Sequence, residues 1–417
     1  MKKTLSLLLL TGIMIFACMA VGSAEAADPE RFVSGDYTYV LNEDGTAYLT
    51  AFHPEAYPFT LVNGERILTL PETIDGIVVT GLGPYTLASS FRKSYRSQAE
   101  MEKGIIVLEI PASLALVNEL SLQHVDAVRV SPKNETFAVV DDVLFHRAEK
   151  KLVFYPKAKK DAFYEIPEGT QTIGEGAFYN CGSLTGILIP DSITRIEGSA
   201  FSHCTGLTAI VIPGSVTELG YFAFSGCESL TDAVISDGVT GIGDGVFMGC
   251  NTLTSIVLPN NMTKIGDAFF QGCDSLTTVV IPGSVTEIGV WAFFGCYRLT
   301  DIVIPDSVTE IWESAFESCT GLVRIVIPDG VATLRGSVFY ECDSLAEVVI
   351  PGSVTAIGEC AFVRCYSLTT LTIPDSVVSI DDLAFLDCED LTLTVGRGSY
   401  AERYAMQNDI PYTYAGL

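Results

Sequence analysis

The stretch GLTAIVIPGSVTELGYFAFSGCESL, residues 206–230, decides the fold of this chain because the sequence repeats it with small changes. A closely similar sequence, SLTTVVIPGSVTEIGVWAFFGCYRL, occurs again at residues 275–299. A cysteine recurs every 23 residues, and each has a phenylalanine three residues before it and a leucine three residues after it. A fixed period of this size indicates a solenoid, in which each repeat forms one turn of a coil.

A proline recurs in most units, and positions are counted here from that proline, so that +1 is the residue after it. Ser236 takes the place of the proline in one unit. Apolar residues at +20 and +22, such as Ile210 and Ile212, alternate with period two and predict a short strand. Positions +10, +11 and +14 have the spacing of one or two helical turns. Glycine is frequent at +7, but Trp312 and Arg335 fill the same position, so a positive φ is not required there.

The recurring cysteines are predicted to stack into a ladder inside the coil, because successive coils place equivalent residues about 4.8 Å apart. Parallel Cβ atoms at that distance are too far apart for a disulfide, which prefers about 3.8 Å, so we expect reduced, buried thiols that pack as small hydrophobic groups. The alternative, a string of metal ions, requires converging ligands, and no histidine or acidic column accompanies the cysteines. Cys360 lies off this register and is expected to be a lone exposed thiol. The predicted structural ladder comprises Cys181, Cys204, Cys227, Cys250, Cys273, Cys296, Cys319, Cys342, Cys365 and Cys388.

The consensus L-x-x-I-x-I-P-x-S-V-T-x-I-G-x-x-A-F-x-x-C resembles the BspA-like leucine-rich repeat family. The opening GDYTYVLNEDGTAYLTAF, the insert FAVVDDVLF with KLVFYP, and the ending GRGSYAERYAMQNDIPYTY are similar to that family's N-terminal part, hairpin insert and C-terminal cap. The resemblance implies an α/β-type solenoid, a right-handed leucine-rich-repeat coil with a parallel concave β-sheet. It also implies a secreted or surface-displayed bacterial protein that takes part in adhesion. Residues 81–105 depart from the period.

The two ends of the chain differ from the repeats. Residues 1–26 read as a signal peptide cleaved after Ala26, and lipidation at Cys18 is the alternative. Residues 27–162 are expected to hold an N-terminal hairpin cap with its turn at residues 42–45, degenerate repeats and a hairpin insert. Regular 23-residue repeats follow at 163–395. Residues 396–417 should form a short helical cap through Ala401, Tyr404 and Ala405.

The predicted binding surface lies on the strands, because +21 must point outward between the inward positions +20 and +22. Seven successive valines at +21 span about 29 Å, a length typical of an interaction site, although valine also favours strands for its own sake. Position +19 beside them varies, as a recognition surface requires, although neutral drift of a solvated position gives the same variation. The candidate residues are Val211, Val234, Val257, Val280, Val303, Val326 and Val349, with Asp232, Asp301, Arg324 and Glu347 at +19.

Composition narrows the function further. The net charge of −27 repels phosphate backbones and discourages self-association, so we expect a monomer with no nucleic-acid partner. No apolar stretch after the leader is long enough to cross a bilayer. The sequence predicts no catalytic residue, cofactor or metal site, and an enzyme would need an acidic pocket in which His124 and His146 converge. We therefore expect a protein that binds an extracellular protein of a host or neighbouring cell. The alternative is an envelope spacer without a discrete ligand site.

Overall fold

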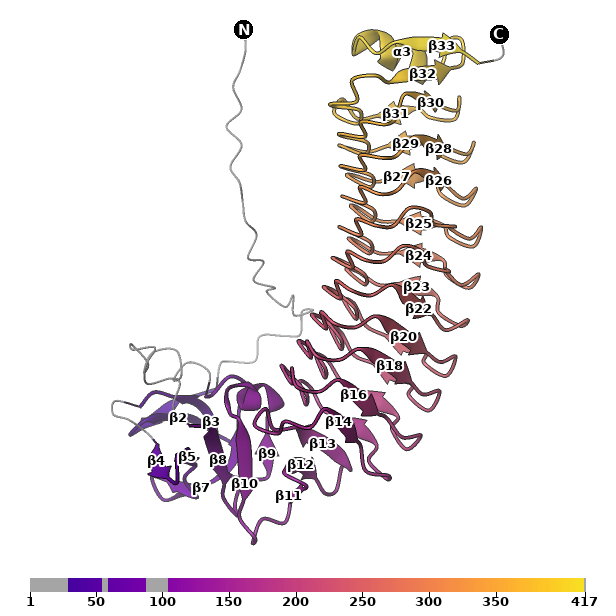
Figure 1. Ribbon diagram of the computed structural model, residues 1–417. Coiled ribbons are helices and arrows are strands. Elements are labelled where there is room, and N and C mark those ends of the chain that lie inside the picture. Colours follow the sequence, from indigo (N-terminus) through magenta and orange to yellow (C-terminus); the bar gives the residue numbers. More distant parts are fainter. Residues whose placement is uncertain (1–28, 55–58, 88–103, 416–417) are drawn as a thin grey trace.

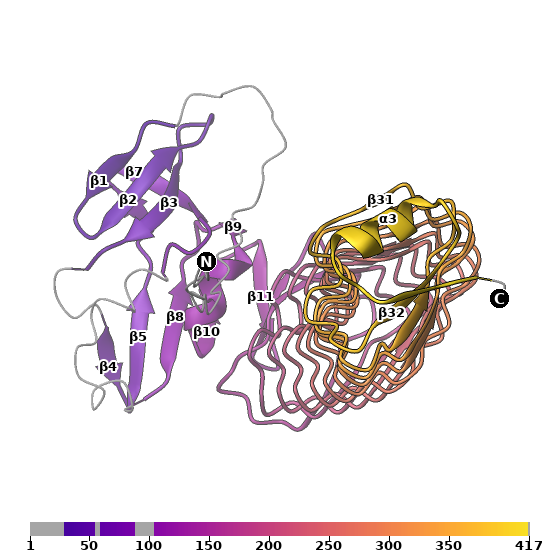
Figure 2. The ribbon, with the colours of Figure 1, turned by 90° about the horizontal axis from the view of Figure 1, so that it is seen from above.

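The computed structural model describes residues 29–54, 59–87 and 104–415. Figure 1 shows two N-terminal sheets that lead into a long stack of coils, which bends and ends at a short helix. Seen from above in Figure 2, the coils overlie one another as one elongated ring, with the N-terminal sheets beside them. The expected leader, its cleavage after Ala26 and the alternative lipid on Cys18 lie outside the described residues, as does most of the irregular segment 81–105.

The N-terminal part consists of two sheets and a 3₁₀ helix. One sheet has the order β1-β2-β3-β7-β6, with β9 also pairing with β7, and the other has the order β10-β8-β5-β4. The predicted hairpin is confirmed, because β2 and β3 are antiparallel and the amide of Gly45 donates to the carbonyl of Asn42 across the turn. The elements are β1 (Phe32–Ser34), β2 (Tyr37–Leu41), β3 (Ala47–Phe52), β4 (Thr60–Val62), β5 (Glu65–Thr69), β6 (Thr73–Ile74), β7 (Ile77–Leu82), β8 (Ile106–Ile110), β9 (Leu116–Val117), η1 (Glu119–His124) and β10 (Ala127–Val130).

The hairpin insert joins this part to the coils. Strands β11 (Phe137–Val140), β12 (Val143–His146) and β13 (Lys151–Phe154) are antiparallel in sequence order. Asp141 and Asp142 form the tight turn between β11 and β12 with φ angles of 49° and 65°. Strand β13 then pairs in parallel with the first short strand of the coils, so the insert provides the edge on which the regular ladder begins.

Two parallel ladders run along the coils, and paired residues differ by one repeat, as Ala209 and Asp232 do. The long strands carry positions +19 to +22, and the short strands carry +5 and +6. The long strands are β14 (Phe163–Glu165), β16 (Gly186–Leu188), β18 (Ala209–Ile212), β20 (Asp232–Ile235), β22 (Ser255–Val257), β26 (Arg324–Val326), β28 (Glu347–Val349), β30 (Thr370–Thr372) and β32 (Thr392–Val395), and β33 (Tyr412–Tyr414) pairs with the last of them. The short strands are β15 (Thr172–Ile173), β17 (Arg195–Ile196), β19 (Glu218–Leu219), β21 (Gly241–Ile242), β23 (Lys264–Ile265), β24 (Glu287–Ile288), β25 (Glu310–Ile311), β27 (Thr333–Leu334), β29 (Ala356–Ile357) and β31 (Ser379–Ile380).

The segment that carries the phenylalanine forms a third hydrogen-bonded ladder instead of the expected helical turn. The amide of Phe201 donates to the carbonyl of Ala223 in the next coil at 2.8 Å, and equivalent bonds recur along the stack. The helix prediction was wrong because left-handed residues interrupt each segment, as Ser199 and His203 do with φ angles of 53° and 60°. Even Trp291, a bulky residue, adopts a φ of 55° there. Such backbone is stable only where neighbouring coils fix it on both sides.

Glycine at +7 allows close approach of coils and does not supply a positive φ. A Cβ on Gly220 would lie 2.4 Å from the backbone nitrogen of Gly198 in the preceding coil. A Cβ on Gly243 would lie 2.5 Å from the backbone nitrogen of Tyr221. The sequence-based view that the +7 position does not demand a left-handed residue is confirmed.

The core is a column of stacked rings with a cap at each end. Phe293 is fully buried, and its ring centroid lies 5.3 Å from that of Phe270 and 5.2 Å from that of Phe316. At the C-terminal end, α3 (Tyr400–Gln407) buries Ala401, Tyr404 and Ala405, and the Tyr404 ring packs edge-on against the last phenylalanine at 6.1 Å. The predicted helical cap is therefore confirmed. Such covers shield apolar faces that the terminal coils would otherwise expose.

Candidate binding surface

The surface formed by +19 and +21 on the long strands is called the strand face here. Val280 and Val303 are its most exposed members, at 83% and 73% of their surface. Val234 is half-buried. The remaining valines of the column, Val211, Val257, Val326 and Val349, are exposed between 40% and 61%. The structure therefore places an apolar stripe along the strands, with its most open part in the middle.

The middle of the stripe coincides with a change in backbone pairing. Regular strands stop after β22 and resume at β26, and between them the long-strand ladder is reduced to isolated bridges, Val280 to Val303 and Asp301 to Arg324. The buried neighbours Val279 and Ile302 still point into the core, so the outward direction of both valines is kept. The two most accessible valines thus lie where the sheet is least regular.

Charged side chains flank the valines at +19. The guanidinium of Arg324 pairs with Glu347 at 3.0 Å, and both side chains are more than half exposed. Asp232 accepts a hydrogen bond from the hydroxyl of Thr231 at 2.7 Å, and Asp301 is exposed. Surface pairs of this kind add little stability, so these side chains remain available to a partner at small cost.

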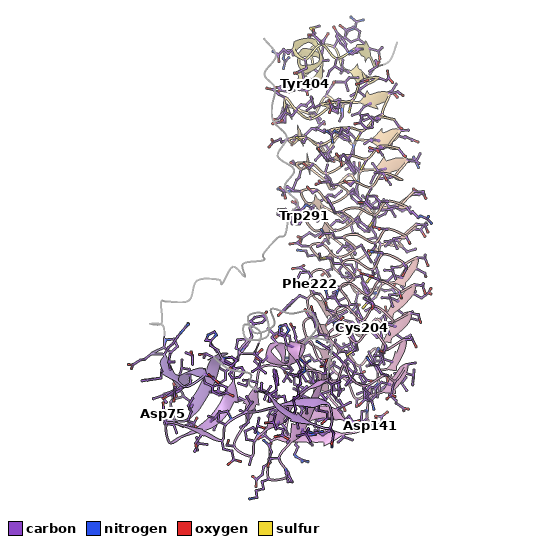
Figure 3. The ribbon with its side chains drawn as sticks, turned by 60° about the vertical axis from the view of Figure 1, so that its left-hand side comes forward. Asp75, Asp141, Cys204, Phe222, Trp291 and Tyr404 are labelled. Atoms are coloured by element: carbon purple, nitrogen blue, oxygen red, sulfur yellow. The ribbon has the colours of Figure 1, made fainter. Side chains whose placement is uncertain are left out.

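The strand face occupies a flank of the bent stack. Figure 3 shows Phe222 and Trp291, from the phenylalanine segments, on the edge opposite the arrows of the long strands. In Figure 1 the labelled long strands β20, β26 and β28 lie on the side of the stack away from the N-terminal sheets.

The ten repeat cysteines form no disulfide and lie inside the coils, with Cys388 at the last coil partly exposed. The Cys250 thiol donates to the carbonyl of Phe224 in the preceding coil at 3.2 Å, and nine thiols from Cys204 to Cys388 repeat this bond at 2.9 to 3.2 Å. Burial raises the pKa of Cys250 to about 12. Neutral thiols in such surroundings are inert, so the ladder holds the coils together and offers no reactive site.

The remaining chemistry-bearing residues are engaged in packing. The His146 ring packs edge-on against Phe137, and the His203 ring against Tyr179. Cys360 is half-buried, and burial raises its pKa. Within the described residues, no group of three side chains could hold a metal ion, and no helix there is both long and apolar enough to traverse a bilayer.

One feature of the surface was missed in the sequence. A groove beside the short strands β17, β19 and β21 is lined by carboxylates, glycines and Tyr221. Its signal was available at +7 and +8, where a tyrosine follows Gly220 and acidic residues stand in most other coils. Reading the glycines only as turn residues concealed it.

Stacked 23-residue coils with two parallel ladders and capped ends define a leucine-rich-repeat solenoid. Residues 171–300 and 263–392 match the family described as BspA type leucine rich repeat region, and together they cover more than half of the chain. The chain belongs to this family.

Several solved structures are similar to this chain. The pneumococcal vaccine antigen PcpA is 15% identical over 93% of this chain and 99% of its own, with a TM-score of 0.53, and shares the fold. A leucine rich cell surface protein from Faecalibacterium prausnitzii is 22% identical over 94% of this chain and 96% of its own, with a TM-score of 0.45. A leucine rich repeat protein from T. pallidum is 37% identical over 38% of this chain and 77% of its own, with a TM-score of 0.37. No curated protein matches the sequence.

Proposed function

We propose that this chain is a secreted or cell-surface monomer that binds an extracellular protein of a host or neighbouring cell through the strand face. The observation that carries the proposal is the uninterrupted valine column, whose two central members expose more than 70% of their surface. Apolar stripes of this length are uncommon on soluble monomers unless something covers them. Burial of the valines would supply affinity, and the charged side chains at +19 would supply selectivity.

The test begins with capture of surface proteins by the biotin-labelled chain after mild cross-linking, followed by affinity measurement with the purified partner. Val280→Asp combined with Val303→Asp should weaken binding at least about tenfold, because two charges would then face an apolar contact. Val378→Asp is the matched control, because Val378 is 65% exposed and lies at +4, away from the strand face. Unchanged affinity in the double variant, with unchanged thermal unfolding, would refute the proposed site.

A spacer role in the cell envelope is the second candidate. The observation that favours it is the same column, because valine is a strong strand former and repeats copy one another. A spacer predicts that capture recovers no specific partner while the chain still lies at the surface. Mass spectrometry of the mature N-terminus separates the two modes of display: a start at Ala27 indicates release, and a lipid on Cys18 indicates anchoring.

A further inference from the structure

The groove beside the short strands lies apart from the strand face and has a volume of about 540 Å³. Its floor is backbone, because Gly198, Gly220 and Gly243 carry no side chains there. Tyr221, Glu218 and Arg195 supply its larger lining side chains, together with Glu175 and Glu197. Its lining residues are Glu175, Arg195, Ile196, Glu197, Gly198, Glu218, Leu219, Gly220, Tyr221, Gly241, Ile242 and Gly243.

The ring of Tyr221 is held in one orientation. It lies over Gly198 of the preceding coil, where a Cβ would stand only 2.7 Å from the ring carbon Cζ. Its hydroxyl donates to Oε1 of Glu175, one coil further back, at 2.6 Å. The side chain is nevertheless 51% exposed. An aromatic face that is fixed at both ends and open to solvent needs little ordering when a ligand stacks on it.

The charge of the groove is negative. Glu218 pairs with Arg195 at 2.9 Å, and Glu197 pairs with Lys151 at 2.8 Å. Lys151 also pairs with Glu119, so it is shared between two carboxylates. Glu175 accepts a hydrogen bond from the Tyr221 hydroxyl, and with it the four carboxylates outnumber the two cations, Arg195 and Lys151, by two. A carboxylate has about four lone-pair directions, so each still has acceptor capacity for a further cation.

The same columns hold an arginine side chain four coils further along the stack. There the guanidinium of Arg335 stacks on the ring of Trp312 at 4.1 Å. It also pairs with Glu310 at 2.9 Å and approaches Glu313 at 3.6 Å. Trp312 and Arg335 both occupy +7, in successive coils, whereas Glu310 occupies +5 and Glu313 occupies +8. The chain itself therefore shows which group an aromatic ring and carboxylates at these positions accommodate.

In the groove, the positions that correspond to Arg335 and Trp312 are Gly243 and Gly220, so neither of these two positions sends a side chain into the space. The carboxylate at +5 is kept as Glu218, and the residue at +8 is the aromatic Tyr221. We propose that this groove binds an arginine side chain of a partner protein, with the guanidinium stacked on Tyr221 and paired with Glu218 and Glu175. A planar guanidinium combines stacking with forked hydrogen bonds to carboxylates, which an ammonium group does not.

This site does not depend on the strand face, because it uses other columns and another class of contact. The net charge of −27 draws basic segments toward the whole molecule, whereas the groove selects the shape of one side chain. A partner that engaged both surfaces would gain avidity from the pair. The two sites are nevertheless tested with different ligands, so the failure of one leaves the other standing.

The probe is a fluorescein-labelled Gly-Arg-Gly-Arg-Gly-Arg-Gly peptide, measured by fluorescence anisotropy against the whole chain. The same peptide with citrulline in place of arginine keeps the shape but lacks the charge. Tyr221→Ala should weaken binding of the arginine peptide by about threefold to thirtyfold, the range of a cation–π contact. Tyr297→Ala is the matched control, because Tyr297 is 49% exposed and lies outside the groove.

Two charge variants complete the test. Glu218→Gln should weaken binding, whereas Glu287→Gln should not, although Glu287 occupies the same column and also pairs with a cation, Lys264, at 3.2 Å. Gly241→Arg should block the peptide, because an arginine there reaches Glu218 and its Cβ would meet no atom closer than 3.5 Å. Equal binding of the citrulline peptide, or equal losses in Tyr221→Ala and Tyr297→Ala, would overturn the proposal. If Tyr221→Ala does not fold, two measurements still test the proposal: binding of the arginine peptide to Gly241→Arg, and binding of the citrulline peptide to the wild-type chain.

Discussion

Phe293→Ala tests whether the ring column holds the coils together. The wild-type side chain is fully buried between the rings of Phe270 and Phe316. Removing a buried phenylalanine costs about 3–5 kcal/mol through lost transfer free energy and the cavity left behind. The upper half of that range applies here, because hydrogen-bonded backbone on both sides keeps the coils at their spacing and prevents collapse into the cavity. Phe293→Leu keeps apolar volume and should lose less than half as much.

The measurement is urea-induced unfolding in reducing buffer, followed by far-ultraviolet circular dichroism, with the slope compared between variants. A changed slope would indicate that the repeat array no longer unfolds as one unit, which repeat proteins can do. Val303→Ala is the control, because Val303 lies nearby and is 73% exposed, so its loss should stay within about 0.5 kcal/mol. A loss below about 1 kcal/mol in Phe293→Ala, or one no larger than in the control, would refute the role of the column.

Two further outcomes follow from the same ladders. Because burial raises the pKa of Cys250 to about 12, the folded state disfavours the thiolate, so the contribution of this thiol to stability should be full below the ordinary thiol pKa and should be lost as pH rises above it. The urea midpoint should decline less steeply with pH in Cys250→Ala than in the wild type between about pH 8 and 10.5, and parallel declines in the two proteins would contradict this. Gly220→Ala should destabilise the chain by about 1–3 kcal/mol, because its Cβ would lie 2.4 Å from the Gly198 nitrogen. Gly283→Ala is the control, because its Cβ would meet nothing within 4 Å, and thermal melts should show it to be neutral or slightly stabilising.

The solenoid could be predicted from the sequence because the 23-residue period determines which residues of successive coils are in contact. Once the coils repeat every 23 residues, a phenylalanine must face the phenylalanine of the next coil, and apolar side chains at +20 and +22 must point inward. The C-terminal cap was also predictable, since Ala401, Tyr404 and Ala405 share a helical face that can only cover the last coil. These features follow from spacing alone and need no knowledge of backbone angles.

The segment around each phenylalanine could not be predicted in the same way. Its apolar spacing fits a helix, but residues as different as Ser199 and Trp291 adopt left-handed backbone there, so no residue type signals it. The thiol-to-carbonyl bonds were hidden for a related reason, because they join Cys250 to a carbonyl of the preceding coil. The groove depends on Tyr221 lying over a glycine one coil earlier, a contact that exists only once the coils are stacked.

Constant and variable columns therefore answer different physical demands. A ladder residue contacts the equivalent residues of the coils above and below it. A substitution in one coil therefore disturbs the packing of three coils, which favours the same residue type at every position of the column. A side chain at +7 or +8 also touches neighbouring coils, but it borders solvent, so a single coil can exchange glycine for Trp312 or Arg335 without breaking the stack. Such exchanges are where a repeat protein can build a local site. The two regions show this tolerance of substitution in different ways. At Tyr221 glycines at +7 leave a groove, whereas further along the stack Arg335 occupies the corresponding position and stacks on Trp312.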